Sequence, residues 1–252
     1  MSTSHSSRHA HEIEHGARIA LEAEEVWGWS SPAGRLRARR RADLLLGLGR
    51  VRSASIVLEL GCGIGIFSEL LSGSGARLVG IDISEDLLRR ARARSEKLNA
   101  SGARVEFERA SIHHLPHGGG TFDAVIGSSI LHHLEVAPAL DEVQRVLKPG
   151  GRFVVAEPNM LNPQIMIQKN VPPIKRWAGD TPDETAFFRW PLARQLARAG
   201  FTEIAIEPYD FLHPSIPPRL IPGVDRLGRF LERLPVFREF AGSLIIAATK
   251  PS

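Results

Sequence analysis

The sequence predicts an α/β protein built on a doubly wound, mostly parallel sheet of seven strands. Between residues 55 and 249, short runs rich in β-branched residues alternate with helical segments, which is typical of βαβ units. A glycine-rich turn follows the first of these runs, and an acidic residue ends the second. In such sheets ligands bind beyond the carboxyl ends of the strands, so we expect the functional site there.

Two amphipathic helices are expected ahead of the sheet, over residues 10–29 and 35–48. The segment Ser30-Ser31-Pro32-Ala33-Gly34 separates them, because proline and glycine interrupt helices. We therefore assign residues 1–52 to an N-terminal helical cap.

The remaining chain, residues 53–252, is expected to form one domain. Its seven strands are expected at residues 55–60, 77–81, 104–108, 122–127, 152–156, 202–207 and 244–249. The helices between them are expected near residues 65–71, 85–98, 138–147 and 192–199. Two further segments, at about 158–190 and 210–242, are rich in proline and apolar residues, so we expect two ordered lid insertions over the site.

The composition favours a soluble, cytoplasmic protein with one substantial core. Of 252 residues, 43% are hydrophobic, and Cys62 is the only cysteine, which excludes an intrachain disulfide and a CxxC metal or redox site. No apolar run approaches the roughly 20 residues that a membrane span requires. The formal net charge is +4, but acidic residues are interleaved throughout, which argues against a nucleic-acid surface. The densest basic run holds Arg35, Arg37, Arg39, Arg40 and Arg41.

The turn after the first strand contains Gly61, Gly63 and Gly65. Glycine lets the chain reverse sharply, and the bare amides at the start of the next helix can face a ligand. Asp82 ends the second strand about 20 residues later, where a carboxylate can accept hydrogen bonds from ribose hydroxyls. Capping of the following helix is a second role open to Asp82, although Ser84 is equally well placed for it.

The glycine spacing distinguishes this turn from a dinucleotide-binding loop. It is GxGxG, whereas the third glycine of GxGxxG would fall on Ile66. A loop of this kind suits a cofactor that has no pyrophosphate.

Five ordered stretches within roughly residues 56–156 resemble the motifs of class I S-adenosylmethionine-dependent methyltransferases. They are VLELGCGIGIF (57–67), GIDIS (80–84), LP followed by FDAVI (115–126), ILHHL (130–134) and RVLKPGG (145–151). The resemblance implies a Rossmann-like methyltransferase fold with S-adenosylmethionine as its cofactor. The cofactor-binding residues that it implies are Glu59, Gly61, Cys62, Gly63, Gly65, Asp82, Ile83, Ser111, Ile112, Gly127 and Ser128.

Within this set, the resemblance implies Glu59 and the loop near the methionine end, Asp82 on the ribose and Ile83 against the adenine face. One position departs from the family pattern. Where many members have Asp before the LP dipeptide, this chain has Ser111, which can still accept a hydrogen bond.

The chemistry requires little acid–base machinery, because transfer from a sulfonium is an in-line displacement that depends mainly on alignment. A base would still assist a hydroxyl acceptor. His133 is the first candidate, followed by His132, Glu157 and His213. For the His pair, capping of the next helix or packing against the sheet is the alternative role. No metal is expected: His113, His114 and His117 lie beside a run of three glycines and are interpreted as a solvated turn, because nearby Asp or Glu ligands and a helical HxxxH spacing are lacking.

The expected acceptor is a small organic molecule, methylated at a hydroxyl oxygen of an apolar or glycosylated metabolite. The turn Gly127-Ser128-Ser129-Ile130 lacks the Asn/Asp-Pro-Pro-aromatic sequence that enzymes methylating exocyclic amines of nucleobases share. Methylation at pyrimidine C5 needs a cysteine nucleophile outside the cofactor loop, and Cys62 lies inside it. Phe187, Phe188, Trp190 and Phe211 in the insertions would wall the acceptor pocket. Trp27-Gly28-Trp29, with Arg35 and Arg39, would close over the cofactor.

Three other functions stay open from the sequence alone. One is a nicotinamide-dependent oxidoreductase on the same fold, another is a cofactor-binding protein without catalysis, and the last is a methyltransferase that modifies RNA through the basic run. The sequence does not determine the oligomeric state.

Overall fold

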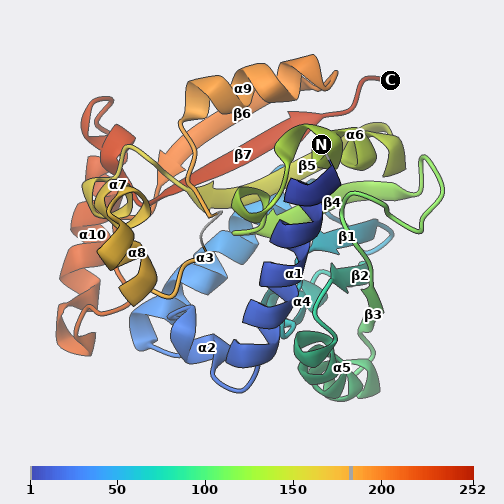
Figure 1. Cartoon of the computed structure of the whole chain (residues 1–252), viewed down its shortest axis with the longest axis horizontal. Helices are drawn as coiled ribbons and strands as arrows, with labels where there is room; N and C mark the ends of the chain where they lie inside the picture. The colour runs from blue at the N-terminus through green and yellow to red at the C-terminus, as the bar shows by residue number, and fades with distance from the viewer. Residues whose placement is uncertain (1, 182–183) are drawn as a thin grey trace.

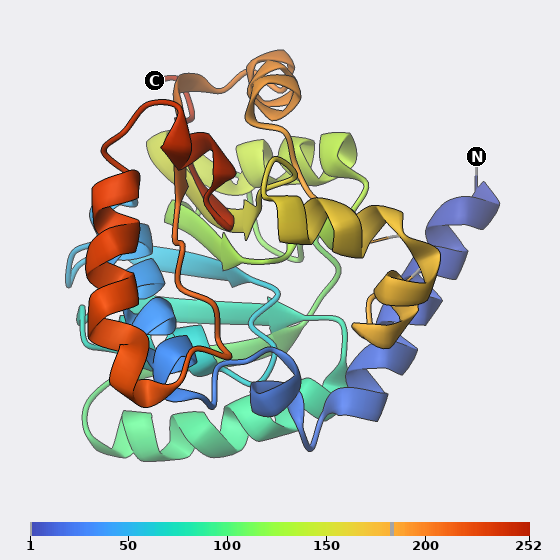
Figure 2. The same cartoon turned by 90° about the vertical axis from the view of Figure 1, so that its left-hand side faces the viewer.

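The computed structural model describes residues 2–181 and 184–252, with side chains from His11 onward, as a central sheet covered by helices on both faces (Figures 1 and 2). The strands are β1 (Ile56–Leu60), β2 (Arg77–Asp82), β3 (Arg104–Arg109), β4 (Phe122–Ser128), β5 (Leu147–Pro158), β6 (Thr202–Tyr209) and β7 (Ser243–Thr249). Their order is β3-β2-β1-β4-β5-β7-β6, and only β7 runs antiparallel to its neighbours. The predicted fold class is therefore confirmed.

The central strands are buried on both faces, which explains their nearly continuous apolar sequences. One core cluster contains Leu58, Val125 and Phe153, and a second, on alternate positions, contains Val57, Ala124 and Val154. Because β1 and β4 are neighbours while the chain leaves β1 towards β2, the strand order reverses at this pair. A crevice beyond the carboxyl ends of such a pair is where open α/β sheets bind ligands.

The helices between strands also match the prediction: α4 (Ile66–Ser72), α5 (Glu85–Ala100), α6 (Val136–Val146) and α9 (Arg189–Arg198). Ser84 Oγ accepts a hydrogen bond from Leu87 N at 3.4 Å and caps α5. This assigns the capping role to Ser84 and leaves the Asp82 side chain to the cavity side of the strand.

The N-terminal prediction was wrong in detail. The first helix is α1 (Ser2–Ile19), followed by a short α2 (Ala23–Val26), in place of one helix over residues 10–29. The next helix, α3 (Pro32–Leu48), begins inside the segment that was predicted to separate the two helices. Ser31 Oγ accepts from Gly34 N at 2.9 Å, and Pro32 occupies the first turn, where no amide hydrogen is needed. Ser31-Pro32 is therefore a helix start.

Short helices lie in both of the long apolar segments. They are α7 (Pro163–Asn170) and α8 (Pro172–Trp177) after β5, and η2 (Pro218–Leu220), α10 (Ile221–Leu231) and η3 (Phe237–Phe240) after β6. In Figure 1, α7 and α8 lie at the left of the molecule and α1 lies near its centre. Within residues 2–181 and 184–252, no helix has both the length and the apolar composition to cross a bilayer.

Candidate functional site

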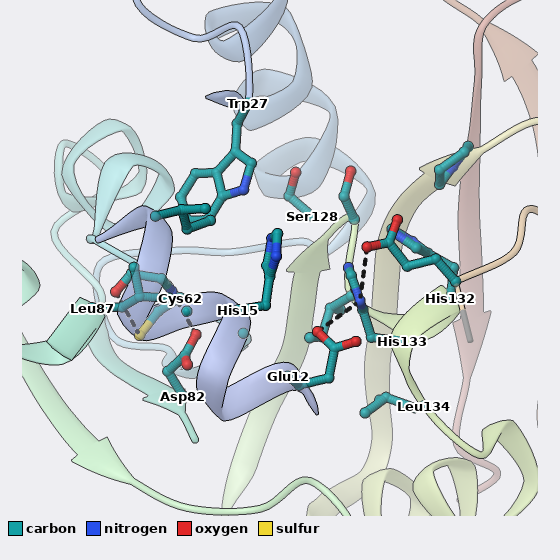
Figure 3. A pocket seen from close by; sticks show the side chains of 18 of the residues that line it. Glu12, His15, Trp27, Cys62, Asp82, Leu87, Ser128, His132, His133 and Leu134 are labelled. Atoms are coloured by element: carbon teal, nitrogen blue, oxygen red, sulfur yellow. Dashed lines mark hydrogen bonds and ion pairs between the residues drawn. The ribbon is translucent and has the colours of Figure 1, made fainter. Parts of the chain in front are cut away.

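A cavity of about 450 Å³ lies beyond the carboxyl ends of β1, β2 and β4 (Figure 3). It is enclosed by the loop after β1, the start of α5, the turn η1 (Leu131–His133), α1, α3 and α7. Eight of the expected cofactor residues line it: Gly61, Cys62, Gly63, Asp82, Ile83, Ser111, Ile112 and Ser128. Glu59, Gly65 and Gly127 do not, and of the candidate bases only His132 and His133 do.

The glycine loop has a conformation that side chains disfavour. Gly61 and Gly63 have φ values of +60° and +53°, in the left-handed region. A methyl group on Gly61 would lie 2.4 Å from Ile130, and one on Gly63 would lie 2.8 Å from Trp27. Both positions therefore require glycine, and Trp27 of the N-terminal cap rests on the loop itself.

Asp82 connects the loop to the next strand. Its Oδ2 accepts from Gly63 N and its Oδ1 accepts from Ser84 N, each at 2.9 Å. Burial raises the pKa of Asp82, and these two backbone bonds oppose that rise. Each carboxylate oxygen keeps a second lone pair on the cavity side, so Asp82 can still accept from two ligand hydroxyls.

Glu59 and Cys62 are both buried beside the glycine loop. Glu59 is buried and hydrogen-bonded by the Ser68 hydroxyl of α4, and burial raises the pKa of Glu59 to about 8. Through this hydrogen bond Glu59 braces α4 against the end of β1. Burial also raises the pKa of the Cys62 thiol well above its ordinary value, so the thiol stays protonated.

Arg41 of α3 places a positive charge at the other end of the cavity. The guanidinium donates to the hydroxyls of Tyr209, Ser128, Ser129 and Ser243 at 2.9–3.1 Å. Only 3% of Arg41 is exposed, and none of the ion pairs among the described residues includes it. A buried charge without a counter-ion is unfavourable, so this end of the cavity suits an anionic ligand group.

The sequence prediction chose the wrong arginines of the basic run. Arg37 and Arg41 line the cavity, whereas Arg35 and Arg39 do not. The helical period of the sequence could have identified Arg41 as a buried residue. The buried positions Gly34, Ala38, Arg41 and Leu45 of α3 follow one another at spacings of three and four residues.

Most of the basic run is neutralised or enclosed by the fold. Arg37 pairs with Asp210 at 2.7 Å, and Arg40 pairs with Glu232. With Arg41 buried, these contacts leave Arg35 and Arg39 as the exposed members of the run. The RNA alternative therefore loses most of the surface on which it rested.

His132 is held in place by Glu157. His132 Nδ1 lies 2.7 Å from Glu157 Oε2, while Glu157 Oε1 accepts from Ile130 N and Leu131 N at 2.9 and 2.8 Å. Burial would raise the pKa of Glu157, but His132 and the two amides hold it below its ordinary value. Glu157, fully buried, thus fixes the shape of η1.

Replacement of Glu157 by alanine should lower the free energy of unfolding by about 3 kcal/mol, because two buried amides and one imidazole lose their acceptor. Urea denaturation followed by circular dichroism measures this. Glu157→Gln, which keeps an acceptor and the volume, should cost distinctly less. A loss below about 1 kcal/mol for the alanine variant would contradict the structural role.

His133 faces the cavity and pairs with carboxylates from two other segments. Its Nδ1 lies 3.0 Å from Glu12 Oε2 of α1 and 3.8 Å from Glu184 Oε1 (Figure 3). Burial alone would lower the pKa of His133, but the contacts with Glu12 and Glu184 outweigh it and raise the pKa. Thr181 Oγ1 also donates to Glu12 at 2.9 Å, so α1 and the segment before Glu184 meet over the histidine. The sequence prediction missed both carboxylates.

One group of described residues has the composition of a metal site. The ligand atoms of His132, His133 and Glu184 lie within 4.8 Å of one another. Lys169 Nζ, however, lies 2.7 Å from Glu184 and 2.9 Å from Asp180. Since a lysine already supplies the positive charge beside Glu184, the arrangement favours an ion-pair network over a metal centre.

His213 lies apart from this network. Its Nε2 is 2.9 Å from Gln164 Nε2, and its Nδ1 accepts from Ser215 N at 3.2 Å. The histidine thereby links the segment after β6 to α7.

Comparison with known proteins identifies what the chain resembles. A family model described as "Methyltransferase domain" matches residues 58–155. A demethylmenaquinone methyltransferase of Thermobifida fusca is 33% identical over 198 residues, which cover 66% of this chain and 83% of that protein. A demethylmenaquinone methyltransferase of Clavibacter sepedonicus is 42% identical over 102 residues, 40% of each chain.

Among solved structures, the N-methyltransferase NodS from Bradyrhizobium japonicum, in complex with S-adenosylhomocysteine, superposes with a TM-score of 0.64. That match covers 96% of this chain and 99% of the other at 18% identity, and so concerns the fold. The chain spans only 35% and 40% of the length of two of the curated relatives that it matches.

Proposed function

The chain belongs to the class I S-adenosylmethionine-dependent methyltransferases, and on that premise we propose that it methylates a small organic acceptor at a hydroxyl oxygen. S-adenosylmethionine is the cofactor. The observation that carries the proposal is that Asp82 and Arg41 line two ends of one cavity, with the glycine loop between them. A ribose diol and an amino-acid carboxylate are the two groups that such ends recognise.

In the proposed arrangement, the adenosine lies towards Asp82, Ile83, Ser111 and Ile112. The methionyl carboxylate binds the Arg41 guanidinium, which carries its charge without a protein counter-ion. The methyl group then points to the side of the cavity that holds His133, on the far side of His15 from Asp82 in Figure 3.

The acceptor would enter between His133 and α7. Ile165, Gln168 and Lys169 of α7 line this side of the cavity, together with Ile130 and Leu134. A mainly apolar wall with a few polar groups suits an organic metabolite. The relatives named demethylmenaquinone methyltransferases and a 27-O-demethylrifamycin SV methyltransferase of Amycolatopsis mediterranei, 30% identical over 145 residues, support an acceptor of this class.

Alignment supplies most of the proposed catalysis, and His133 supplies the base. The enclosed cavity would hold acceptor oxygen, methyl carbon and sulfur in line. Neutral His133 would accept the hydroxyl proton as the oxygen–carbon bond forms and the carbon–sulfur bond breaks, leaving S-adenosylhomocysteine. Glu12 would stabilise the imidazolium that results.

The pairing of His133 with Glu12 gives a pH prediction. Glu12 favours the protonated imidazole and so raises the pKa of His133, which means that the neutral base forms only at higher pH. Glu12→Gln should therefore lower the pKa of His133 and shift the rise of kcat/KM to lower pH. Proton NMR titration of the His133 ring measures the pKa without an acceptor, and an unchanged titration in the variant would contradict the pairing.

A methyl-transfer screen tests the proposed acceptor class. The protein is incubated with trideuteromethyl S-adenosylmethionine and either metabolite extracts or total RNA, and the products are analysed by mass spectrometry. The proposal expects labelled small molecules, with His133→Ala slower by about a hundredfold where the base is needed. Label in RNA alone would favour the RNA-modifying alternative. The family membership leaves the nicotinamide-dependent alternative without support.

A further inference from the structure

Helix α10 exposes much of its apolar side to the outside. Leu227 and Phe230 are 57% and 55% exposed, and Gly228 is the only buried residue of the helix. Gly228 packs closely on Phe211, because a methyl group at this glycine would lie 3.1 Å from the Phe211 Cβ. The helix thus rests on the fold along one narrow line, and Figures 1 and 2 show it at the edge of the molecule.

The apolar surface continues into η3. Val236 and Phe237 are 70% and 55% exposed. This exposure does not come from a frayed end, since the backbone of η3 is tied to the fold: Asn159 Nδ2 donates to the carbonyls of Glu239 and Ala241 at 2.8 Å, and Asn162 Nδ2 donates to Phe240 O at 2.9 Å. Fixed apolar side chains of this size on a surface mark an interaction site.

The unpaired charges around this apolar surface are all positive. Each acidic residue of the segment is engaged by an arginine: Asp225 with Arg229, Glu232 with Arg40, and Glu239 with Arg189. The exposed Arg219, Arg226 and Arg233, in contrast, form no ion pair with any residue that the structure describes. The surface therefore carries an uncompensated positive charge beside its apolar side chains.

We propose that α10 and η3 form a docking surface for an anionic phospholipid bilayer. An amphipathic helix that lies in the interface buries its apolar side chains among the acyl chains and sets its basic residues against the lipid phosphates. The unpaired arginines favour this occupant over a second copy of the chain, because a two-fold contact would set like charges against each other.

The position of the surface fits its proposed role. In Figure 1, α10 and α7 lie together on the left-hand side of the molecule. Helix α7 lines the cavity with Ile165 and Lys169 and exposes Met166 and Ile167 to the outside. A bilayer bound at α10 and η3 would thus lie near the helix that closes the acceptor side.

Vesicle flotation of the full chain tests the proposal. We expect the protein to float with vesicles containing about a third phosphatidylglycerol, to bind phosphatidylcholine vesicles weakly, and to be released by salt. The double variant R219Q/R226Q should bind the anionic vesicles about 20-fold more weakly. R194Q/R198Q, with two exposed arginines of α9, is the matched control and should bind as the native chain does.

The apolar part of the surface is tested separately. Phe230→Ser should lower vesicle binding markedly, whereas Leu21→Ser, at a more exposed apolar residue outside the surface, should not. Unchanged S-adenosylhomocysteine affinity shows that each variant is folded, so the result does not depend on methyl transfer. Absence of vesicle binding, equal losses in the controls, or a dimer that Phe230→Ser dissociates would overturn the proposal.

Discussion

Replacement of Arg41 by methionine should weaken S-adenosylhomocysteine binding about a hundredfold, as measured by isothermal titration calorimetry. Loss of one partner from a buried, charge-assisted pair costs about 3 kcal/mol, and each 1.4 kcal/mol is a factor of ten in affinity. Arg41→Lys keeps the charge but loses the planar fork, so its affinity should be intermediate. Arg39→Met, at an exposed position of the same helix, is the control and should bind normally.

The same variant also distinguishes binding from folding. The Arg41 guanidinium contacts neutral hydroxyls and the ring of Trp29, so its charge does not balance another charge of the protein. Arg41→Met should therefore unfold at a similar temperature to the native chain without ligand and should gain less stability when ligand is added. Native-like affinity in this variant would contradict the assignment of the carboxylate to Arg41.

Replacement of Asp82 by alanine should weaken S-adenosylhomocysteine binding at least as much, through the ribose end of the ligand. Two acceptor sites for the ribose are lost, and Gly63 N and Ser84 N lose their acceptor as well, which loosens the loop. We expect a loss of affinity for S-adenosylhomocysteine of about a hundredfold or more.

Methylthioadenosine, which has the ribose but no amino-acid carboxylate, separates the two ends. Asp82→Ala should lose affinity for both methylthioadenosine and S-adenosylhomocysteine. Arg41→Met should lose affinity for S-adenosylhomocysteine alone. If both variants lost affinity equally for both ligands, the proposed orientation would be wrong.

The parts of the fold that follow from local pattern were predictable. All seven strands were found because each is a short β-branched run bounded by turn residues, and Gly61, Gly63 and Asp82 follow from the strand–turn–helix arrangement. The helix start at Ser31-Pro32 was also readable from the sequence. It was mistaken for an interruption because proline was weighed without the serine that caps the helix ahead of it.

Arg41 was missed for a different reason. The prediction considered only the summed charge of the arginine run and did not assign its members to faces of the helix. The period of α3 places Arg41 among buried small residues and sets Arg39 on the outside. An arginine on the buried stripe of a helix is the more informative signal, because a buried charge without a charged partner favours an anionic ligand.

Glu12 and Glu184 could not have been assigned from the sequence. Neither belongs to a motif, and their positions beside His133 arise from the packing of α1 and of the segment after α8 against η1. Helices α7 and α8 contain no buried residue, so their placement depends on contacts such as those of Lys169 with Glu184 and Asp180. Such tertiary contacts leave no periodic signal in the chain.

The most direct test of the central claim is a crystal structure of the protein with S-adenosylhomocysteine. We predict one ligand in the cavity, with both ribose hydroxyls hydrogen-bonded to Asp82, the carboxylate bound to Arg41 and the sulfur facing His133. A ligand bound in the reverse orientation, or bound with Arg41 still contacting only the hydroxyls of Tyr209, Ser128, Ser129 and Ser243, would contradict it.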